Sequence, residues 1–149
     1  HKTRLQLGDV LDGTLSTLLR DPRLRGVEIL KVYRQAVDVE TDLSIVERVF
    51  TNIILNAAQA INSAGTLQIA LEDNGAEAVV SFHDTGPGIE PAVLGKIFNP
   101  FFTTRSEGSG LGLALCKKYV EVLGGRIEVS TQVGVGTTFV ISLPKTSKA

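Results

Sequence analysis

The spacing of hydrophobic residues in the first part of the chain predicts two helices separated by a strand. Residues 9–20 carry five aliphatic side chains at helical spacing, and Asp21-Pro22 ends this pattern because the residue before a proline disfavours helix. Residues 27–39 are rich in β-branched and aromatic residues, which predicts one strand. A long helix is expected next, from a polar cap at Thr41 or Asp42 to about Asn62.

The second part of the chain contains segments in which hydrophobic and polar residues alternate. Two of them, 67–71 and 78–83, are joined by the turn signal Asp73-Asn74-Gly75 and predict a β-hairpin. Helices combined with mostly hairpin-linked strands predict an α+β fold built as a two-layer sandwich. The remaining expected elements are a short helix at 91–98, a loop at 99–110, a helix at 111–123, and two strands at 126–131 and 137–143 joined by a glycine turn.

Length, composition and charge narrow the classes of function. The chain has 149 residues, 43% hydrophobic and 21% charged, which fits one globular domain with a core. The net charge is -1, so we expect no nucleic-acid partner, and an anionic ligand needs local donors. Cys116 has no second cysteine to pair with, and we expect it to be a small core residue. No apolar run approaches the ~18–20 residues of a membrane span. The first residues do not resemble a signal peptide, so we expect a domain from the middle of a longer chain.

The long predicted helix carries amides in an unusual position. Asn52 and Asn56 are four residues apart and therefore lie on one face. On a helical wheel Asn56 falls inside the apolar half, with Asn52 and Gln59 at its edge; that half comprises Ile45, Val49, Ile53, Ala57, Ala60 and Ile61. A buried amide must find hydrogen bonds. Asn56 is therefore either a core residue bonded to backbone or an oxygen ligand for a metal ion or phosphate.

A loop with one aspartate and two glycines follows the second hairpin strand. Phe82 and Asp84 share the inward face of that strand because side chains alternate. A carboxylate there needs donors, and the amino group of a purine would serve. Gly86 and Gly88 would let a flat ring approach the backbone closely. The alternative is a turn in which Asp84 caps its own backbone.

A run of glycines stands directly before the helix predicted at 111–123. Residues 108–113 read Gly-Ser-Gly-Leu-Gly-Leu, and glycines at a helix start let free N–H groups face a phosphate. A flexible loop without a ligand is the competing interpretation.

Residues 96–105 place three phenylalanines next to this glycine run. They predict a hydrophobic latch that docks the loop on the body of the domain. They also suit a lid over 99–110, mobile without nucleotide, in which Thr103, Thr104 and Arg105 reach phosphate oxygens.

Along the chain the amide helix, the Asp84 loop, the phenylalanine segment and the glycine run follow one another. In this order the four motifs resemble the GHKL ATPase superfamily over roughly residues 20–144. The sequence PFFTTR followed by GSGLGLAL is similar to the histidine-kinase branch, specifically its nitrogen-sensor-like group. The resemblance implies the Bergerat fold, with a mixed sheet of about five strands covered on one face by about three helices. It also implies that 1–20 is the end of a linker or helix from a preceding dimerisation domain, and that 21–149 is the ATP-binding catalytic domain.

The same resemblance implies a site for ATP and Mg²⁺. Asn56 would hold the metal, Asp84 would accept from the adenine amino group, and Thr137 would assist the aspartate through a shared water. Arg105 would neutralise the γ-phosphate, and the catalytic set would be Asn52, Asn56 and Arg105. The full set of expected nucleotide-binding residues is Asn56, Gln59, Asp84, Gly86, Gly88, Ile89, Phe98, Thr103, Thr104, Arg105, Gly108, Ser109, Gly110, Leu111, Gly112, Leu113 and Thr137.

Two positions depart from the family pattern. Gln59 stands where many histidine kinases carry a basic residue that touches phosphate. A neutral amide can only hydrogen-bond, so Mg²⁺ and Arg105 must neutralise more of the phosphate charge. Asn52 stands where hydrolytic relatives such as gyrase carry a glutamate that activates water, and an amide cannot act as that base. The departure at Asn52 favours transfer to a partner nucleophile over hydrolysis.

The implied phosphate acceptor is a histidine on a separate dimerisation domain, with a response regulator downstream. His83 points to the outward face of its strand and is expected to be a solvated surface residue, and His1 stands at the chain start. We expect a cytoplasmic, monomeric isolated domain whose parent is either soluble or membrane-attached. Two alternatives stay open: a GHKL protein-serine kinase of the anti-sigma type, and a nucleotide-binding module without catalysis.

Overall fold

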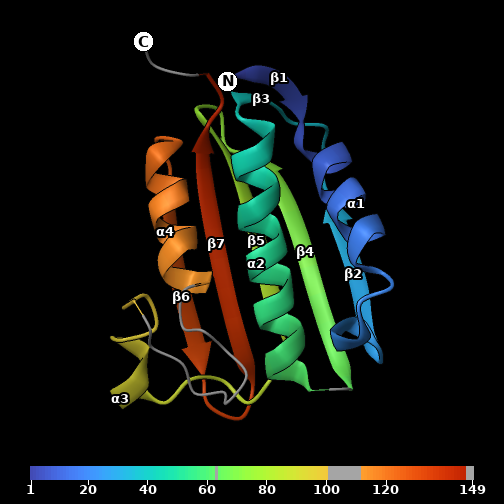
Figure 1. Cartoon of the computed structure of the whole chain (residues 1–149), viewed down its shortest axis with the longest axis vertical. Helices are drawn as coiled ribbons and strands as arrows, with labels where there is room; N and C mark the ends of the chain where they lie inside the picture. Colours follow the sequence, from blue (N-terminus) through green and yellow to red (C-terminus); the bar gives the residue numbers. More distant parts are fainter. Residues whose placement is uncertain (63, 101–111, 147–149) are drawn as a thin grey trace.

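One five-stranded mixed sheet forms the body of the protein, and three helices cover one of its faces (Figure 1). The computed structural model describes residues 1–62, 64–100 and 112–146. Strands β2 and β4 pair in parallel, and the other neighbours pair antiparallel. The predicted two-layer fold is thereby confirmed. In sheet order the strands are β2 (Val27–Tyr33), β4 (Gly65–Asp73), β5 (Glu77–Asp84), β7 (Gly136–Pro144) and β6 (Arg126–Gln132); the covering helices are α1 (Leu7–Leu18), α2 (Leu43–Ile61) and α4 (Gly112–Val122).

A second, two-stranded sheet lies at one end of the domain, where β1 (Thr3–Gln6) pairs antiparallel with β3 (Asp38–Thr41). The prediction of a single strand at 27–39 is therefore wrong. The chain leaves the large sheet after Tyr33 and enters the small one at Asp38. Hydrophobic and polar residues alternate only imperfectly across 27–39, in keeping with this change of sheet. β1 was missed because its four residues become a strand only by pairing with a distant segment.

The remaining elements follow their local signals closely. Asp42 caps α2, accepting from the backbone N–H of Ile45 at 3.2 Å. The Pro22–Leu24 segment forms a short 3-10 helix after α1, as expected of a proline that stops a helix. The helix predicted at 91–98 is shorter than expected, since α3 spans only Pro91–Leu94. Among the described residues, no helix is both long and apolar enough to cross a bilayer.

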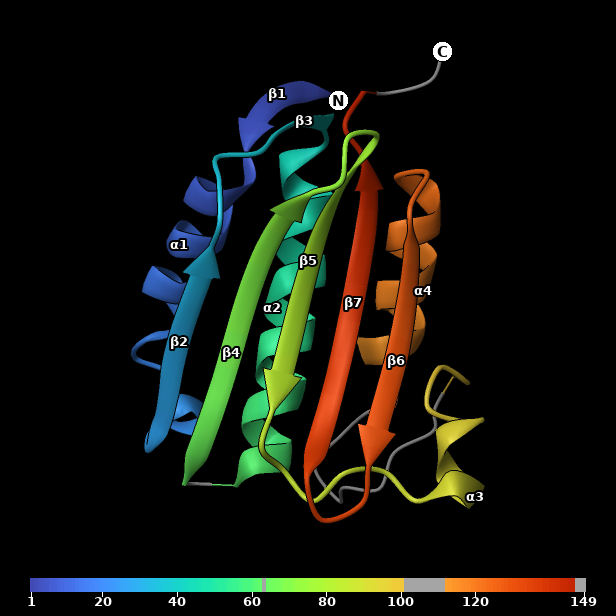
Figure 2. The same ribbon diagram turned by 180° about the vertical axis from the view of Figure 1, so that it is seen from behind.

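The core lies between the sheet and the helices, and α2 is its central element (Figures 1 and 2). The ring centroids of Phe50 and Phe82 are 5.8 Å apart, which joins α2 to the middle of the sheet. The helical wheel was rotated relative to the observed burial, since Asn56 and the predicted apolar residues Ile45 and Ala60 are half-buried. The buried residues of α2 are Val46, Val49, Phe50, Ile53, Ile54, Ala57, Ala58 and Ile61.

Helix α1 belongs to the same core. Leu7 and Leu11 are fully buried, and Leu15 and Leu18 nearly so. These leucines join the hydrophobic cluster that holds α2 and the sheet. The division proposed at residue 20 stays a prediction, but the packing gives residues 7–18 a structural role in this domain.

Cys116 is buried on α4 and joins that helix to α2. Its Sγ lies 3.4 Å from the carbonyl oxygen of Val49, and its exposed fraction is 0%. Burial raises the pKa of the Cys116 thiol to about 12. The expectation of a core cysteine is confirmed.

Replacing Leu11 by alanine will lower the free energy of unfolding by about 2–5 kcal/mol, because it removes a fully buried side chain from the core. Leu19→Ala is the matched control, since Leu19 is 70% exposed and its loss is expected to cost less than about 0.5 kcal/mol. Urea unfolding followed by circular dichroism measures both. Equal, small effects would show that α1 does not belong to the cooperative folding unit.

Cys116 will resist alkylation in the native protein and react on unfolding. With a pKa near 12 only about one thiol in ten thousand is thiolate at pH 8, and the thiolate is the nucleophile. Labelling with iodoacetamide at increasing urea concentration, read by mass spectrometry, will therefore follow the unfolding curve. Fast labelling without urea would contradict the packing of α4 on α2.

Candidate functional site

A row of polar side chains crosses three strands at one end of the sheet. Asp84 on β5 is the register partner of Thr137 on β7, and Thr137 is the partner of Thr131 on β6. Asp84 is 1% exposed and Thr137 is 4% exposed. Because register partners point to the same face, all three lie on the side of the sheet that the helices cover. The predicted inward direction of Asp84 and Thr137 is confirmed.

The loop after Asp84 is fastened to the β6–β7 hairpin. The backbone N–H of Gly86 donates to Oδ1 of Asp84 at 2.9 Å, and the N–H of Gly134 donates to the carbonyl of Pro87 at 2.8 Å. The N–H of Ile89 donates to Oγ1 of Thr131 at 2.9 Å. The loop is held at its start, middle and end, so its shape depends on the hairpin beside it. The turn interpretation, in which Asp84 caps its own backbone, is therefore part of the structure.

Two glycines are required here by the approach of the protein's own backbone. Gly88 has φ +79°, and a Cβ on it would lie 2.5 Å from the carbonyl oxygen of Gln132. A Cβ on Gly136 would overlap the carbonyl oxygen of Asp84. Neither position tolerates a side chain. The sequence suggested that Gly88 makes room for a ligand ring, and the structure gives a reason that needs no ligand.

The predicted amides lie along one side of α2, beside the start of α4. Asn52, Asn56 and Gln59 are all half-buried. The Nδ2 of Asn52 lies 3.5 Å from the carbonyl oxygen of Gly112, the first residue of α4. Asn52 thus links α2 to the end of the glycine run, and Asn56 stands one turn further along the helix. The amide helix and the end of the glycine run therefore meet near the middle of α2.

Phe98 and Ile97 anchor the segment that follows α3. Ile97 is buried, and the ring of Phe98 packs edge-on against Phe139 with centroids 6.3 Å apart. The Nζ of Lys117 lies 5.6 Å from the centre of the Phe98 ring, a distance that suits a cation–π contact. These contacts agree with the predicted docking of the latch.

Part of the predicted site lies outside the described residues, as does most of the loop expected at 99–110. Gly112 and Leu113 open α4, where Gly112 is exposed and Leu113 packs against the core. The site residues that lie outside are Thr103, Thr104, Arg105, Gly108, Ser109, Gly110 and Leu111.

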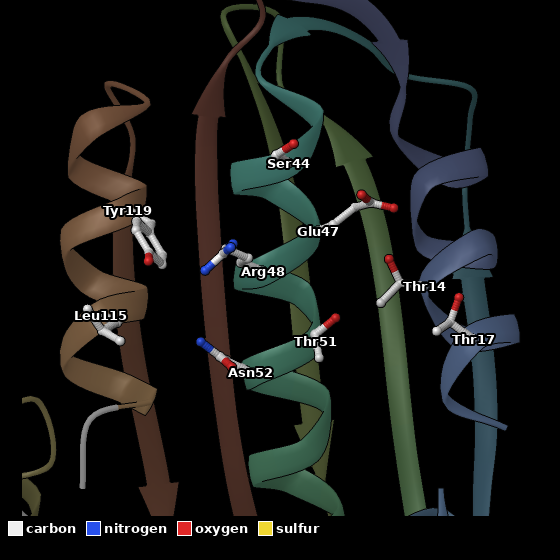
Figure 3. Close-up of a pocket in the computed structure, with 9 residues that line it drawn as sticks. All are labelled: Thr14, Thr17, Ser44, Glu47, Arg48, Thr51, Asn52, Leu115 and Tyr119. Carbon is white, nitrogen blue, oxygen red and sulfur yellow. The ribbon is translucent and has the colours of Figure 1, made fainter. Parts of the chain in front are cut away.

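A groove of about 530 Å³ runs along the exposed side of α2. Figure 3 shows Arg48 and Asn52 extending toward α4, and Glu47 and Thr51 extending toward α1. Hydroxyl, amide and charged groups share its lining with the apolar surface of residues such as Leu115 and Tyr119. Asn52 belongs both to the lining of this groove and to the line of amides on α2. Within the described part of the chain, no three histidine, cysteine or acidic side chains are grouped closely enough to hold a metal ion.

His83 lies on the opposite face of β5 from Asp84, as predicted from the alternation of the strand. It is half-buried, and its Nδ1 lies 2.7 Å from Oγ1 of Thr138. The expectation of a solvated surface histidine is wrong in this respect, because Thr138 stands directly opposite in the register and partners it. His83 is therefore a structural residue of the uncovered sheet face.

Thr131 was not predicted as a site residue. Its Oγ1 contacts three groups: the N–H of Ile89, the carbonyl of Gly136 and Oγ1 of Thr137. The only sequence signal was its placement opposite Thr137 in the predicted final hairpin. Recognising it would have required the register of that hairpin.

Comparison with known proteins places these features in a family. Sensor histidine kinase ZraS of Escherichia coli (strain K12) is 34% identical over 141 residues, covering 94% of this chain and 30% of that protein. The catalytic domain of histidine kinase ThkA superposes with a TM-score of 0.89 at 30% identity, covering 98% of this chain and 97% of that domain. ThkA in complex with response regulator protein TrrA gives a TM-score of 0.84 at 28% identity, covering 97% of this chain and 42% of the ThkA chain.

The family described as "Histidine kinase-, DNA gyrase B-, and HSP90-like ATPase" matches residues 41–147. The matched segment includes the amide helix, the Asp84 loop, the glycine run and the final hairpin. It covers well over half of the chain, and the solved histidine-kinase domain shares the fold over nearly its whole length. The chain therefore belongs to the family of histidine kinase-, DNA gyrase B- and HSP90-like ATPases.

Proposed function

We propose that the chain is the ATP-binding catalytic domain of a sensor histidine kinase. In this role it transfers the γ-phosphoryl group of ATP to a histidine on a separate dimerisation domain, and a response regulator acts downstream. The observation that carries the proposal is the buried carboxylate of Asp84, in one row with Thr137, in a chain of this family. The chain spans 30% of the length of ZraS, and the proposal places the phosphate-accepting histidine outside the chain.

The adenine base is assigned to the row formed by Asp84 and Thr137. An ionised carboxylate accepts several hydrogen bonds, so Asp84 can accept from the adenine amino group while it accepts from Gly86. Thr137 lies next to Asp84 in the register and can act through a shared water. Gly88 and Ile89 lie along the purine in this proposal, on a loop that the hairpin holds in place.

The phosphates are assigned to the side of α2 and the start of α4. Mg²⁺ fits the donors present, because one amide oxygen together with phosphate oxygens and water is a ligand set that this ion accepts. Asn56 would hold the ion, which neutralises phosphate charge when bound. Gln59 hydrogen-bonds a phosphate, and Asn52 positions the start of α4 through Gly112. Further phosphate contacts are proposed for Thr103, Thr104, Arg105, Gly108, Ser109, Gly110, Leu111, Gly112 and Leu113, with Phe98 anchoring the segment that bears them.

The phosphate acceptor is supplied from outside the chain. Asn52 is an amide and cannot act as a base for water, while His83 is turned to the other face of β5 and hydrogen-bonded to Thr138. Residues 1–20 are proposed to continue a helix or linker from the dimerisation domain. The proposed setting is the cytoplasm, and the isolated domain is proposed to be a monomer. Phosphoryl transfer relies on positioning and charge neutralisation, which these residues can supply.

Replacing Asp84 by asparagine will weaken ATP binding between about tenfold and one-hundredfold, because the contact to the adenine amino group loses its charge-assisted strength. Asp38→Asn is the matched control, since Asp38 lies on the small sheet far from the row. Calorimetry with Mg²⁺-ATP measures both variants, with circular dichroism to confirm folding. Unchanged ATP affinity in a folded Asp84→Asn protein would remove Asp84 from the site.

The chain will phosphorylate a histidine supplied in trans but will not label itself. Transfer is expected to be slow because the two domains are not tethered at high effective concentration. The experiment combines the chain, radiolabelled ATP and the histidine-bearing dimerisation domain of its parent protein, with Asn56→Ala as the inactive control. Acid-labile, base-stable label on the supplied domain supports the proposal. Label on this chain, or acid-stable label on serine, would favour the serine-kinase alternative, and ATP binding without transfer would favour a non-catalytic module.

A further inference from the structure

We propose that Thr131 is a positioning residue that makes the site selective for a 6-aminopurine over a 6-oxopurine. The inference rests on the proposed function, because it concerns the base bound by the row that contains Asp84. Thr131 lies on β6, two strands away from Asp84, and its Oγ1 lies 2.9 Å from Oγ1 of Thr137, the register partner of Asp84.

The hydrogen bonds of Thr131 determine where each hydroxyl proton lies. A threonine hydroxyl has one donor and two acceptor positions. The N–H of Ile89, 2.9 Å from Oγ1, can only donate, and the carbonyl of Gly136, 3.0 Å away, can only accept. The single proton of Thr131 therefore goes to Gly136. It follows that Thr137, whose Oγ1 lies 2.9 Å from that of Thr131, is the donor of the pair.

This arrangement leaves Thr137 with lone pairs and no proton to offer a ligand. Asp84, its neighbour in the row, also offers only acceptors when ionised. A base that enters the row meets two neighbouring acceptors. Adenine presents an amino donor at position 6, whereas guanine and hypoxanthine present a carbonyl acceptor there. The row therefore matches an amino group that contacts it directly and opposes a carbonyl at the same place.

Removing the hydroxyl of Thr131 releases this constraint. In Thr131→Val the shape of the side chain is kept, but Thr137 loses its acceptor and its proton is free to turn toward a 6-oxo group. The N–H of Ile89 also loses its partner, which loosens the loop at its end. Loosening of the loop alone would lower the affinity for all purines alike, whereas reorientation of the Thr137 proton would change the preference for one purine over another. Selectivity thus separates a positioning role from a structural one.

The test compares the affinities of ATP and inosine triphosphate, which differ in the 6-position group and in the N1 proton that accompanies it. The measurement is calorimetric competition with Mg²⁺ present. We expect Thr131→Val to reduce the preference for ATP at least about tenfold, the equivalent of about one hydrogen bond. Thr131→Ser keeps the hydroxyl and is expected to restore the preference to within about threefold. Thr138→Val is the matched control, because it removes the neighbouring hydroxyl, which bonds His83 on the other sheet face.

The outcomes distinguish this inference from the proposed function. An unchanged preference in Thr131→Val, with or without weaker ATP binding, would overturn the role of Thr131 and leave the proposed function intact. Failure of the unmodified chain to bind ATP would overturn both. If Thr131→Val does not fold, Thr131→Ala adds no bulk and answers the same question by the same ratio. An equal loss of preference in Thr138→Val would also overturn the inference.

Discussion

The alternation of side chains along β5 is the constraint on which the proposed site depends. In the described part of the chain, helices cover one face of the large sheet and leave the other bare, so every second residue of β5 is buried from Ala78 to Asp84. The last of these positions is a carboxylate, and burial of a carboxylate costs free energy unless donors surround it. Because the hydrophobic residues before it determine the strand's orientation, Asp84 cannot turn away without turning Phe82 out of the core. Packing energy thus holds a polar group where it would not otherwise lie.

The backbone N–H of Gly86 offsets part of that cost by donating to Asp84 at 2.9 Å, and the final hairpin holds the loop that bears Gly86. Among the described residues, no buried side-chain nitrogen or oxygen lacks a hydrogen-bond partner, and the hairpin supplies several of the partners around the row. Thr131 contacts Thr137 directly and holds Ile89, while Gly134 holds Pro87. Satisfied polar networks rigidify a structure, whereas partly satisfied ones are costly. The loop after Asp84 is consequently shaped before any ligand arrives, which reduces the ordering cost of binding.

The sequence predicted the structure correctly where interactions between residues close in the chain determine it. Two-residue alternation placed Asp84 and Thr137 on the inward face, and turn chemistry placed the β4–β5 hairpin and the cap of α2. It was insufficient where a distant partner decides the outcome. The break after Tyr33 occurs because residues 38–41 pair with β1, and a strand reading of 27–39 contains no sign of that partner. Asn56 is half-buried rather than central because α1, α4 and the sheet together determine which side of α2 is enclosed. Thr131 escaped notice because its three hydrogen bonds cross between strands and loop.

The same alternation separates the proposed donor from the only histidine in the body of the domain. His83 and Asp84 are adjacent in sequence and therefore face opposite sides of one sheet. A nucleotide bound in the row of Asp84 is thus screened from His83 by the strands themselves, and Thr138 further holds the imidazole on the uncovered face. In the proposed function, Asn52 offers no base for water, so the domain would hold ATP until a nucleophile on a second domain approaches it.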